Sequence, residues 1–177
     1  MKETVEVLIS EQGIAKRIDE IAERVSKDFE GKTISLICVL KGGVMFMVDL
    51  AKKLKQTVEF DFLDISSYGN STESSGIIKI DKDLENPITG KHVLLVEDII
   101  DSGRTLAHLH RHLWAQGPAE LKICTLLDKP DRRVDHSITP DYVGFVIPDE
   151  FVVGYGLDYA QRYRNLSYIG ILRFNEE

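Results

Sequence analysis

The stretch "VLLVEDIIDSGRTL", residues 93–106, passes from an apolar run to acids and then to small polar residues over a short length. Its apolar start is typical of a strand buried on both faces, as in a parallel sheet. Its end, with Gly103 among hydroxyl-bearing residues, is typical of a loop that opens a helix. The stretch therefore predicts a strand–loop–helix unit that carries Glu97 and Asp98 out of a buried strand.

The same alternation extends through about the first 130 residues and predicts an α/β fold, a twisted, mostly parallel sheet flanked by helices. We expect strands at residues 33–40, 58–66, 77–80, 92–98 and 120–128, and helices at residues 11–29, 44–54 and 105–116. After Lys129 the pattern changes to the short β-type segments "YVGFVI", "FVVGYG" and "LSYIGIL". We expect a single domain over residues 1–177, with its core at about residues 30–130.

The composition excludes some classes of protein. A net charge of −7 argues against a broad nucleic-acid-binding surface, which needs a basic stripe, but it is compatible with a small phosphorylated ligand. No apolar run approaches the roughly 20 residues of a membrane helix, and the N-terminus lacks the apolar block of a signal peptide. Cys38 and Cys124 lie in apolar runs and are expected to be buried thiols. We therefore expect a soluble cytoplasmic protein.

Ligands of such sheets bind at the carboxyl ends of the strands, where this chain has two unusual loops, residues 40–43 and 97–105. In residues 101–105, backbone N–H groups and the helix dipole favour a phosphate, although the same loop could simply cap a helix. Glu97 and Asp98 would repel a bare phosphate, but they could accept hydrogen bonds from sugar hydroxyls or bind Mg²⁺. Together these groups predict a site for a sugar phosphate whose diol faces the acids.

Residues 93–106 resemble the phosphoribosyl-diphosphate (PRPP) signature of type I phosphoribosyltransferases: four apolar residues, two acids, two apolar residues, Asp, small, Gly, variable, Thr. Four further segments resemble the hypoxanthine-guanine branch of that family, in its order: "LKGG" (40–43), "SSYGNST" (66–72), "LLDKPDRR" (126–133) and "IPDEFVVGYGLDYAQRYRNL" (147–166). The resemblance covers nearly the whole chain. It implies the type I phosphoribosyltransferase fold, with a small purine-binding hood formed by the C-terminal part and the N-terminal segment.

The resemblance assigns one group of residues to PRPP. Glu97 and Asp98 would hold the ribose hydroxyls and, directly or through water, Mg²⁺, while Arg164 would bind pyrophosphate. The 5′-phosphate would be cradled by Asp101, Ser102, Gly103, Arg104 and Thr105. Lys41 and Gly42 resemble the pyrophosphate loop, in which the peptide before the lysine can be cis, and Ser67 and Tyr68 resemble the tip of a lid.

A second group would bind the purine. Phe151 would stack on the ring, the Val152 backbone would meet the pyrimidine edge, and Lys129 would donate to the exocyclic 6-oxygen. Asp158 matches the acid of a second Mg²⁺ site beside the purine. Apart from the resemblance, each of these residues also has an ordinary interpretation, as a core ring, a solvated charge or a turn acid.

The implied reaction is Mg²⁺-dependent transfer of the phosphoribosyl group of PRPP to hypoxanthine and guanine, which gives IMP or GMP and pyrophosphate in purine salvage. Asp101 is the expected acceptor of the purine proton. Lys129 opposes adenine, because an ammonium group offers only donors to a 6-amino group. The family also implies a homodimer or homotetramer. The order of preference among hypoxanthine, guanine and xanthine stays open.

Two alternatives remain. One is a regulatory RNA-binding protein on the same fold, which would need a basic face. The other is a phosphoribosyltransferase for another base, such as xanthine, adenine or orotate.

His108 and His112 share a helix face but make a weak metal site without a third ligand, so we expect solvated histidines. We expect Trp114 to pack against the protein.

Overall fold

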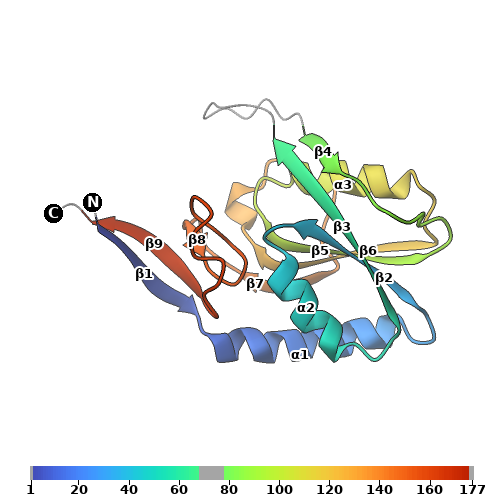
Figure 1. Cartoon of the computed structure of the whole chain (residues 1–177), viewed down its shortest axis with the longest axis horizontal. Helices are drawn as coiled ribbons and strands as arrows, with labels where there is room; N and C mark the ends of the chain where they lie inside the picture. The colour runs from blue at the N-terminus through green and yellow to red at the C-terminus, as the bar shows by residue number, and fades with distance from the viewer. Residues whose placement is uncertain (1, 68–77, 176–177) are drawn as a thin grey trace.

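The computed structural model describes residues 2–67 and 78–175, which form two sheets (Figure 1). The large sheet has the strand order β4-β3-β2-β5-β6-β7. Its strands are β2 (Ile34–Leu40), β3 (Val58–Ser67), β4 (Ile78–Lys82), β5 (His92–Ile100), β6 (Glu120–Asp128) and β7 (Tyr142–Val146). All neighbouring strands are parallel except β3 and β4, which confirms the mostly parallel sheet.

Helices cover both faces of the large sheet. α1 (Glu11–Asp28) and α2 (Val44–Lys53) pack on one face, and α3 (Arg104–Trp114) packs on the other (Figure 1). Successive residues of β5 point to opposite faces, so Leu94 and Val96 join the core beneath α1 and α2, while Val93 and Leu95 join the core beneath α3. This two-sided burial explains the continuous apolar run that predicted a parallel strand.

The small sheet is built from the two ends of the chain. β1 (Lys2–Ile9) pairs antiparallel with β9 (Ile169–Asn175), and β8 (Val152–Val153) pairs with the other edge of β9. This sheet lies beside the large one, at the left of Figure 1, and confirms a hood formed by the terminal segments. β1 was not among the expected strands, although Val5 and Val7 on either side of Glu6 show the alternation typical of a strand.

One strand and one side chain differ from what the sequence predicted. β7 adds a sixth strand to the large sheet from the region after Lys129, where the sequence indicated only short β-type segments. The prediction that Trp114 packs against the protein was wrong: its side chain is 53% exposed and stacks on His110, because it lies off the apolar face of α3.

Cys38 and Cys124 are buried and unpaired, and no described helix is long and apolar enough to cross a membrane.

Candidate active site

A cavity of about 250 Å³ opens at the carboxyl ends of β2 and β5, where the sequence predicted a ligand. Its walls are the end of β2, the loop before α2, Ile65 of β3, and the turn from β5 into α3. The cavity is lined by Val39, Leu40, Gly42, Ile65, Glu97, Asp98, Ile99, Ile100, Asp101, Ser102, Gly103, Thr105 and Leu106. Residues of both candidate loops therefore face the same space.

Residues 101–105, the expected phosphate loop, are held from behind by the segment after β6. The Ser102 carbonyl accepts hydrogen bonds from the backbone N–H groups of Val134 and Asp135, both at 2.9 Å. Gly103 has φ +84, and a Cβ there would lie 2.7 Å from Cδ of Arg133 and closer still to the Asp135 carbonyl oxygen. Only glycine fits this position. The loop then leads directly into α3, whose N-terminal end favours an anion.

Glu97 and Asp98 form an acidic pair at the end of β5. Glu97 is buried, and burial together with the Asp98 charge raises the pKa of Glu97 well above its usual value. Burial also raises the pKa of Asp98, to about 6, although the Ile99 N–H at 2.8 Å opposes that shift. Within residues 2–67 and 78–175, no hydrogen bond or ion pair joins the Glu97 side chain to another residue. Two such carboxylates, facing a cavity, suit a ligand that brings hydroxyl donors or positive charge.

Residues 40–43, the expected pyrophosphate loop, lie directly against these acids. The Leu40–Lys41 peptide is cis, and Lys41 is exposed. A Cβ at Gly42 would overlap the carboxylate of Asp98, so the absence of a side chain lets the loop approach the acid. The resemblance predicted this loop at the site, and Gly42 does line the cavity.

The C-terminal segment brings Asp158 and Arg164 to the same place. Arg164 Nη2 lies 2.8 Å from Asp158 Oδ1, and Nη1 donates to the Gly156 carbonyl at 2.7 Å. Both charges act on Asp98, since Arg164 lowers its pKa and Asp158 raises it. In the described part of the chain, Nε of Arg164 is buried without a hydrogen-bond partner. A cation therefore stands beside the acids with an unused donor.

Glu97, Asp98 and Asp158 offer a metal ion only oxygen ligands, the type that Mg²⁺ prefers. In the described residues, no three of the acids, histidines or cysteines stand close enough together to make a metal site by themselves. That does not disqualify Mg²⁺, which is usually bound through one or two carboxylates, several waters and substrate phosphates. The donor set therefore fits Mg²⁺ bound jointly with a phosphorylated ligand.

The purine-binding candidates lie near the hood. Phe151 is 52% exposed, and the Tyr159 ring meets it edge-on at a centroid distance of 5.8 Å. Lys129 is buried at the end of β6, and its Nζ donates to the Glu150 carbonyl at 2.6 Å, next to Phe151 in the chain. An ammonium group has three donors, so Lys129 can keep this bond and donate to a ligand as well. Val152 is buried in β8.

Two arginines at this end of the sheet were not among the candidates. Arg132 Nε lies 3.2 Å from Asp101 Oδ1, at the mouth of the phosphate loop. The Arg133 side chain is 7% exposed, contacts the Asp128 carboxylate and donates from Nε to the Asp101 carbonyl at 3.3 Å. The segment "LLDKPDRR" contained both, but an arginine in a turn normally predicts a solvated charge. Arg104 is exposed at the start of α3.

The resemblance placed the tip of a lid at Ser67 and Tyr68. Tyr68 lies outside the described residues, and Ser67 is the last residue of β3.

A family model described as "Phosphoribosyl transferase domain" matches residues 5–160. The chain is 50% identical over 175 residues to the hypoxanthine-guanine phosphoribosyltransferase of Bacillus subtilis, covering 98% of this chain and 96% of that protein. It is 49% identical over 172 residues to the protein of the same name from Mycobacterium tuberculosis, covering 94% and 85%. It is 52% identical to the bifunctional protein TilS/HprT of Listeria innocua, of whose length the match spans 26%.

Solved structures of similar proteins superpose closely on this chain. A hypoxanthine-guanine phosphoribosyltransferase from Bacillus anthracis, with HEPES in its active site, superposes with a TM-score of 0.91 at 46% identity, covering 98% of this chain and all of that one. A hypoxanthine phosphoribosyltransferase from Trypanosoma cruzi, in complex with the product IMP, superposes with a TM-score of 0.88 at 40% identity, covering 95% and 94%.

Proposed function

Because the chain belongs to the phosphoribosyl transferase domain family, we propose that it transfers the 5-phosphoribosyl group of PRPP to N9 of hypoxanthine and guanine. The products are IMP or GMP and pyrophosphate, which places the reaction in purine salvage. The observation that carries this proposal is the meeting of the phosphate loop, the acidic pair and the pyrophosphate loop in one cavity.

PRPP has three parts, and each has a counterpart here. The 5′-phosphate suits residues 101–105, where the start of α3 and the hydroxyls of Ser102 and Thr105 provide donors. The ribose diol suits Glu97 and Asp98, which accept hydrogen bonds. The pyrophosphate suits the loop of Lys41 and Gly42 together with Arg164. Only a sugar that is phosphorylated at both ends uses all of these groups.

Mg²⁺ would be held by Glu97, Asp98 and, at a second position, Asp158, and when bound it neutralises the pyrophosphate leaving group. The variant Glu97→Gln/Asp98→Asn tests this part. We expect it to weaken binding of PRPP in the presence of Mg²⁺ far more than binding of free hypoxanthine, because only PRPP brings the diol and the cation-binding phosphates. Isothermal titration calorimetry with both ligands makes the comparison, and an equal loss for both would indicate a damaged fold.

The purine would stack on the exposed face of Phe151 and present its 6-oxygen to Lys129. The purine nitrogen that attacks the ribose must lose a proton, and Asp101 stands on the phosphate loop to accept it. Arg132 fixes the Asp101 carboxylate at the mouth of the loop through the 3.2 Å ion pair. Lys129 and the Glu150 carbonyl hold the hood segment to the end of β6.

Turnover with PRPP, Mg²⁺ and a panel of bases tests the proposal as a whole. We expect nucleotide from hypoxanthine and guanine and almost none from adenine or orotate. If no base gives nucleotide, the proposal is wrong. The alternative, a regulatory RNA-binding protein, predicts nucleotide-independent RNA binding at moderate salt, and the net charge of −7 argues against it. We also propose a cytoplasmic homodimer or homotetramer, and light scattering in solution would measure the subunit number.

A further inference from the structure

A buried tyrosine hydroxyl lies close to the pyrophosphate half of the site but outside the catalytic cavity. Tyr155 is 8% exposed, and its hydroxyl donates to Asp49 Oδ2 of α2 at 2.6 Å. Neither residue lines the catalytic cavity. Both line a second cavity of about 350 Å³, between α1, α2 and residues 165–167. An effect of Tyr155 on the reaction therefore passes through other residues.

The backbone around Tyr155 presses on the pyrophosphate loop. Gly154, Tyr155 and Gly156 all have positive φ angles, of 97°, 50° and 101°. A Cβ at Gly156 would overlap the Gly42 carbonyl oxygen, so the two backbones are in contact. Asp49 lies in α2, which begins just after Gly42 and Gly43. The Tyr155 hydroxyl thus joins the segment that contacts the loop to the helix that continues it, through Asp49 and, at the longer distance of 3.5 Å, through the Met45 carbonyl.

The same backbone segment also carries the pyrophosphate-side charges. The Gly156 carbonyl accepts from Arg164 Nη1 at 2.7 Å, and the Gly156 N–H donates to the Arg164 carbonyl at 2.9 Å. Arg164 in turn pairs with Asp158 at 2.8 Å. A shift of Tyr155 would therefore move Arg164 and Asp158 relative to Gly42.

We propose that the Tyr155–Asp49 hydrogen bond is a positioning contact that fixes the spacing between the pyrophosphate loop and Arg164. The inference rests on the proposed function, because it assigns pyrophosphate to those two groups. A positive φ is unfavourable for tyrosine, so the backbone needs an external contact to keep this conformation. Loss of the bond should weaken ligands that carry pyrophosphate and leave a ligand with only the 5′-phosphate nearly unaffected.

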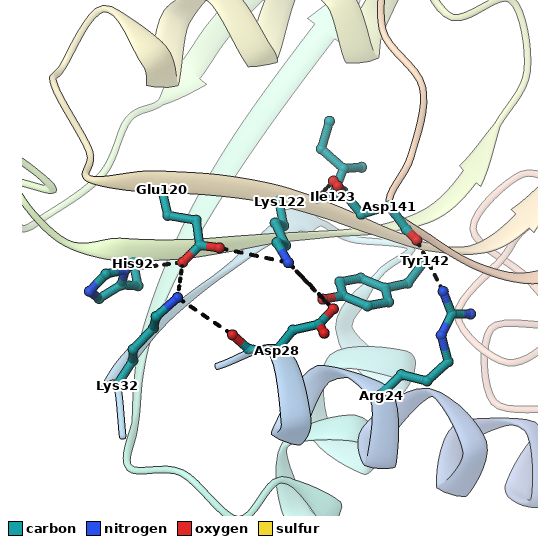
Figure 2. A network of polar contacts seen from close by, with 9 residues as sticks. All are labelled: Arg24, Asp28, Lys32, His92, Glu120, Lys122, Ile123, Asp141 and Tyr142. Atoms are coloured by element: carbon teal, nitrogen blue, oxygen red, sulfur yellow. Dashed lines mark hydrogen bonds and ion pairs between the residues drawn. The ribbon is translucent and has the colours of Figure 1, made fainter. Parts of the chain in front are cut away.

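The chain offers a matched control at the other end of the sheet. Tyr142 is 1% exposed, and its hydroxyl donates to Asp28 Oδ2, also at 2.6 Å. Figure 2 shows this pair within a polar network that ties α1 to the N-terminal ends of β6 and β7. The active site lies at the carboxyl ends of the strands, so the Tyr142–Asp28 bond is comparable in chemistry but remote from the ligand.

The experiment compares full-length wild type, Tyr155→Phe and Tyr142→Phe. Calorimetry would measure dissociation constants for PRPP with Mg²⁺ and for IMP, and steady-state kinetics would give KM for PRPP. For Tyr155→Phe we expect a rise of about 3- to 30-fold in the PRPP dissociation constant and KM, the usual size of coupling through packed residues, with IMP binding changed by less than about 2-fold. Tyr142→Phe should leave both ligands unchanged.

Substitutions at Asp49 separate the hydrogen bond from the charge. Asp49→Asn keeps an acceptor for the Tyr155 hydroxyl but loses the ion pair with Lys52 at 2.7 Å, so it should retain most of the PRPP affinity. Asp49→Ala leaves the Tyr155 hydroxyl only the Met45 carbonyl, at 3.5 Å, and should show the same selective loss of PRPP affinity as Tyr155→Phe. This rescue by asparagine is not expected of a residue that serves only general stability.

Several results would overturn the inference. One is a Tyr155→Phe protein that loses PRPP and IMP affinity equally. The others are an Asp49→Ala protein with normal PRPP affinity and a Tyr142→Phe protein with the same selective loss. Wild-type protein that binds neither PRPP nor IMP would instead refute the proposed function, and this inference with it.

Discussion

The substitution Gly103→Ala provides a quantitative test of the phosphate loop. Gly103 has φ +84, and an added Cβ would lie 2.7 Å from Cδ of Arg133 and nearer to the Asp135 carbonyl. Carbon atoms pack at about 3.5–4.0 Å, so the loop must move by roughly 1 Å relative to residues 133–135. The Asp135 carbonyl is backbone, and the N–H groups of Val134 and Asp135 donate to the Ser102 carbonyl of the loop at 2.9 Å, so this displacement also strains those two hydrogen bonds.

Gly31 is a matched control, because it has φ +73 and nothing within 4 Å of an added Cβ. Gly31→Ala should lower the free energy of unfolding by about 1 kcal/mol, which is the strain of the left-handed conformation minus the gain from a stiffer unfolded chain. Gly103→Ala adds overpacking and should cost about 2–4 kcal/mol in total. At about 2–4 °C for each kcal/mol in a domain of this size, Gly31→Ala should lower Tm by about 2–4 °C and Gly103→Ala by about 4–16 °C.

The effect on activity should separate the two variants more sharply. A displacement of about 1 Å in a binding loop can cost about 10²-fold in rate, so kcat/KM for PRPP should fall by about that factor in Gly103→Ala and stay unchanged in Gly31→Ala. Differential scanning fluorimetry and steady-state kinetics on both proteins give the comparison. If Gly103→Ala is no less stable than Gly31→Ala and keeps its kcat/KM for PRPP, the contact of the loop with residues 133–135 does not shape a phosphate site.

Three further predictions concern other residues. Asp101→Asn should keep PRPP affinity but lower turnover with hypoxanthine by about 10²–10⁴, the usual contribution of a general base, and unchanged turnover would remove Asp101 from that role. Lys129→Met should lose most activity on hypoxanthine and narrow its advantage over adenine, so an unaltered ratio of the two kcat/KM values would show that Lys129 does not discriminate between bases. The Tyr142 hydroxyl holds the pKa of Asp28 below its ordinary value, so the stability that this hydrogen bond contributes is present above about pH 4 and is lost as the pH falls further. Tyr142→Phe should therefore reduce the loss of Tm on acidification below pH 4, and parallel Tm curves for the two proteins would contradict this.

The sequence predicted the large sheet well because its strands have the continuous apolar runs that two-sided burial requires. Leu94 and Val96 on one face, and Val93 and Leu95 on the other, make β5 recognisable without any knowledge of its neighbours. β1 was missed because its stability comes from pairing with β9, at the opposite end of the chain. Such a long-range contact leaves only a weak local signal.

The candidate site also has a part that the sequence predicted and a part that depends on the fold. The phosphate loop and the acidic pair are contiguous in sequence, so their chemistry could be inferred from residue types and spacing alone. The roles of Arg132 and Arg133 depend on the fold, which brings the segment after β6 behind the turn of β5. The Tyr155–Asp49 bond joins residues from the C-terminal segment and α2, and nothing in either local sequence indicates a partner.

A crystal structure of the protein with bound IMP tests the central claim most directly. We predict the 5′-phosphate within about 3 Å of the backbone N–H groups of residues 102–105, and the ribose diol on Glu97 and Asp98. The 6-oxygen should lie at a similar distance from Lys129 Nζ, with Phe151 stacked on the purine. IMP bound with its phosphate away from the Gly103 loop, or with its purine away from Lys129, would contradict the account.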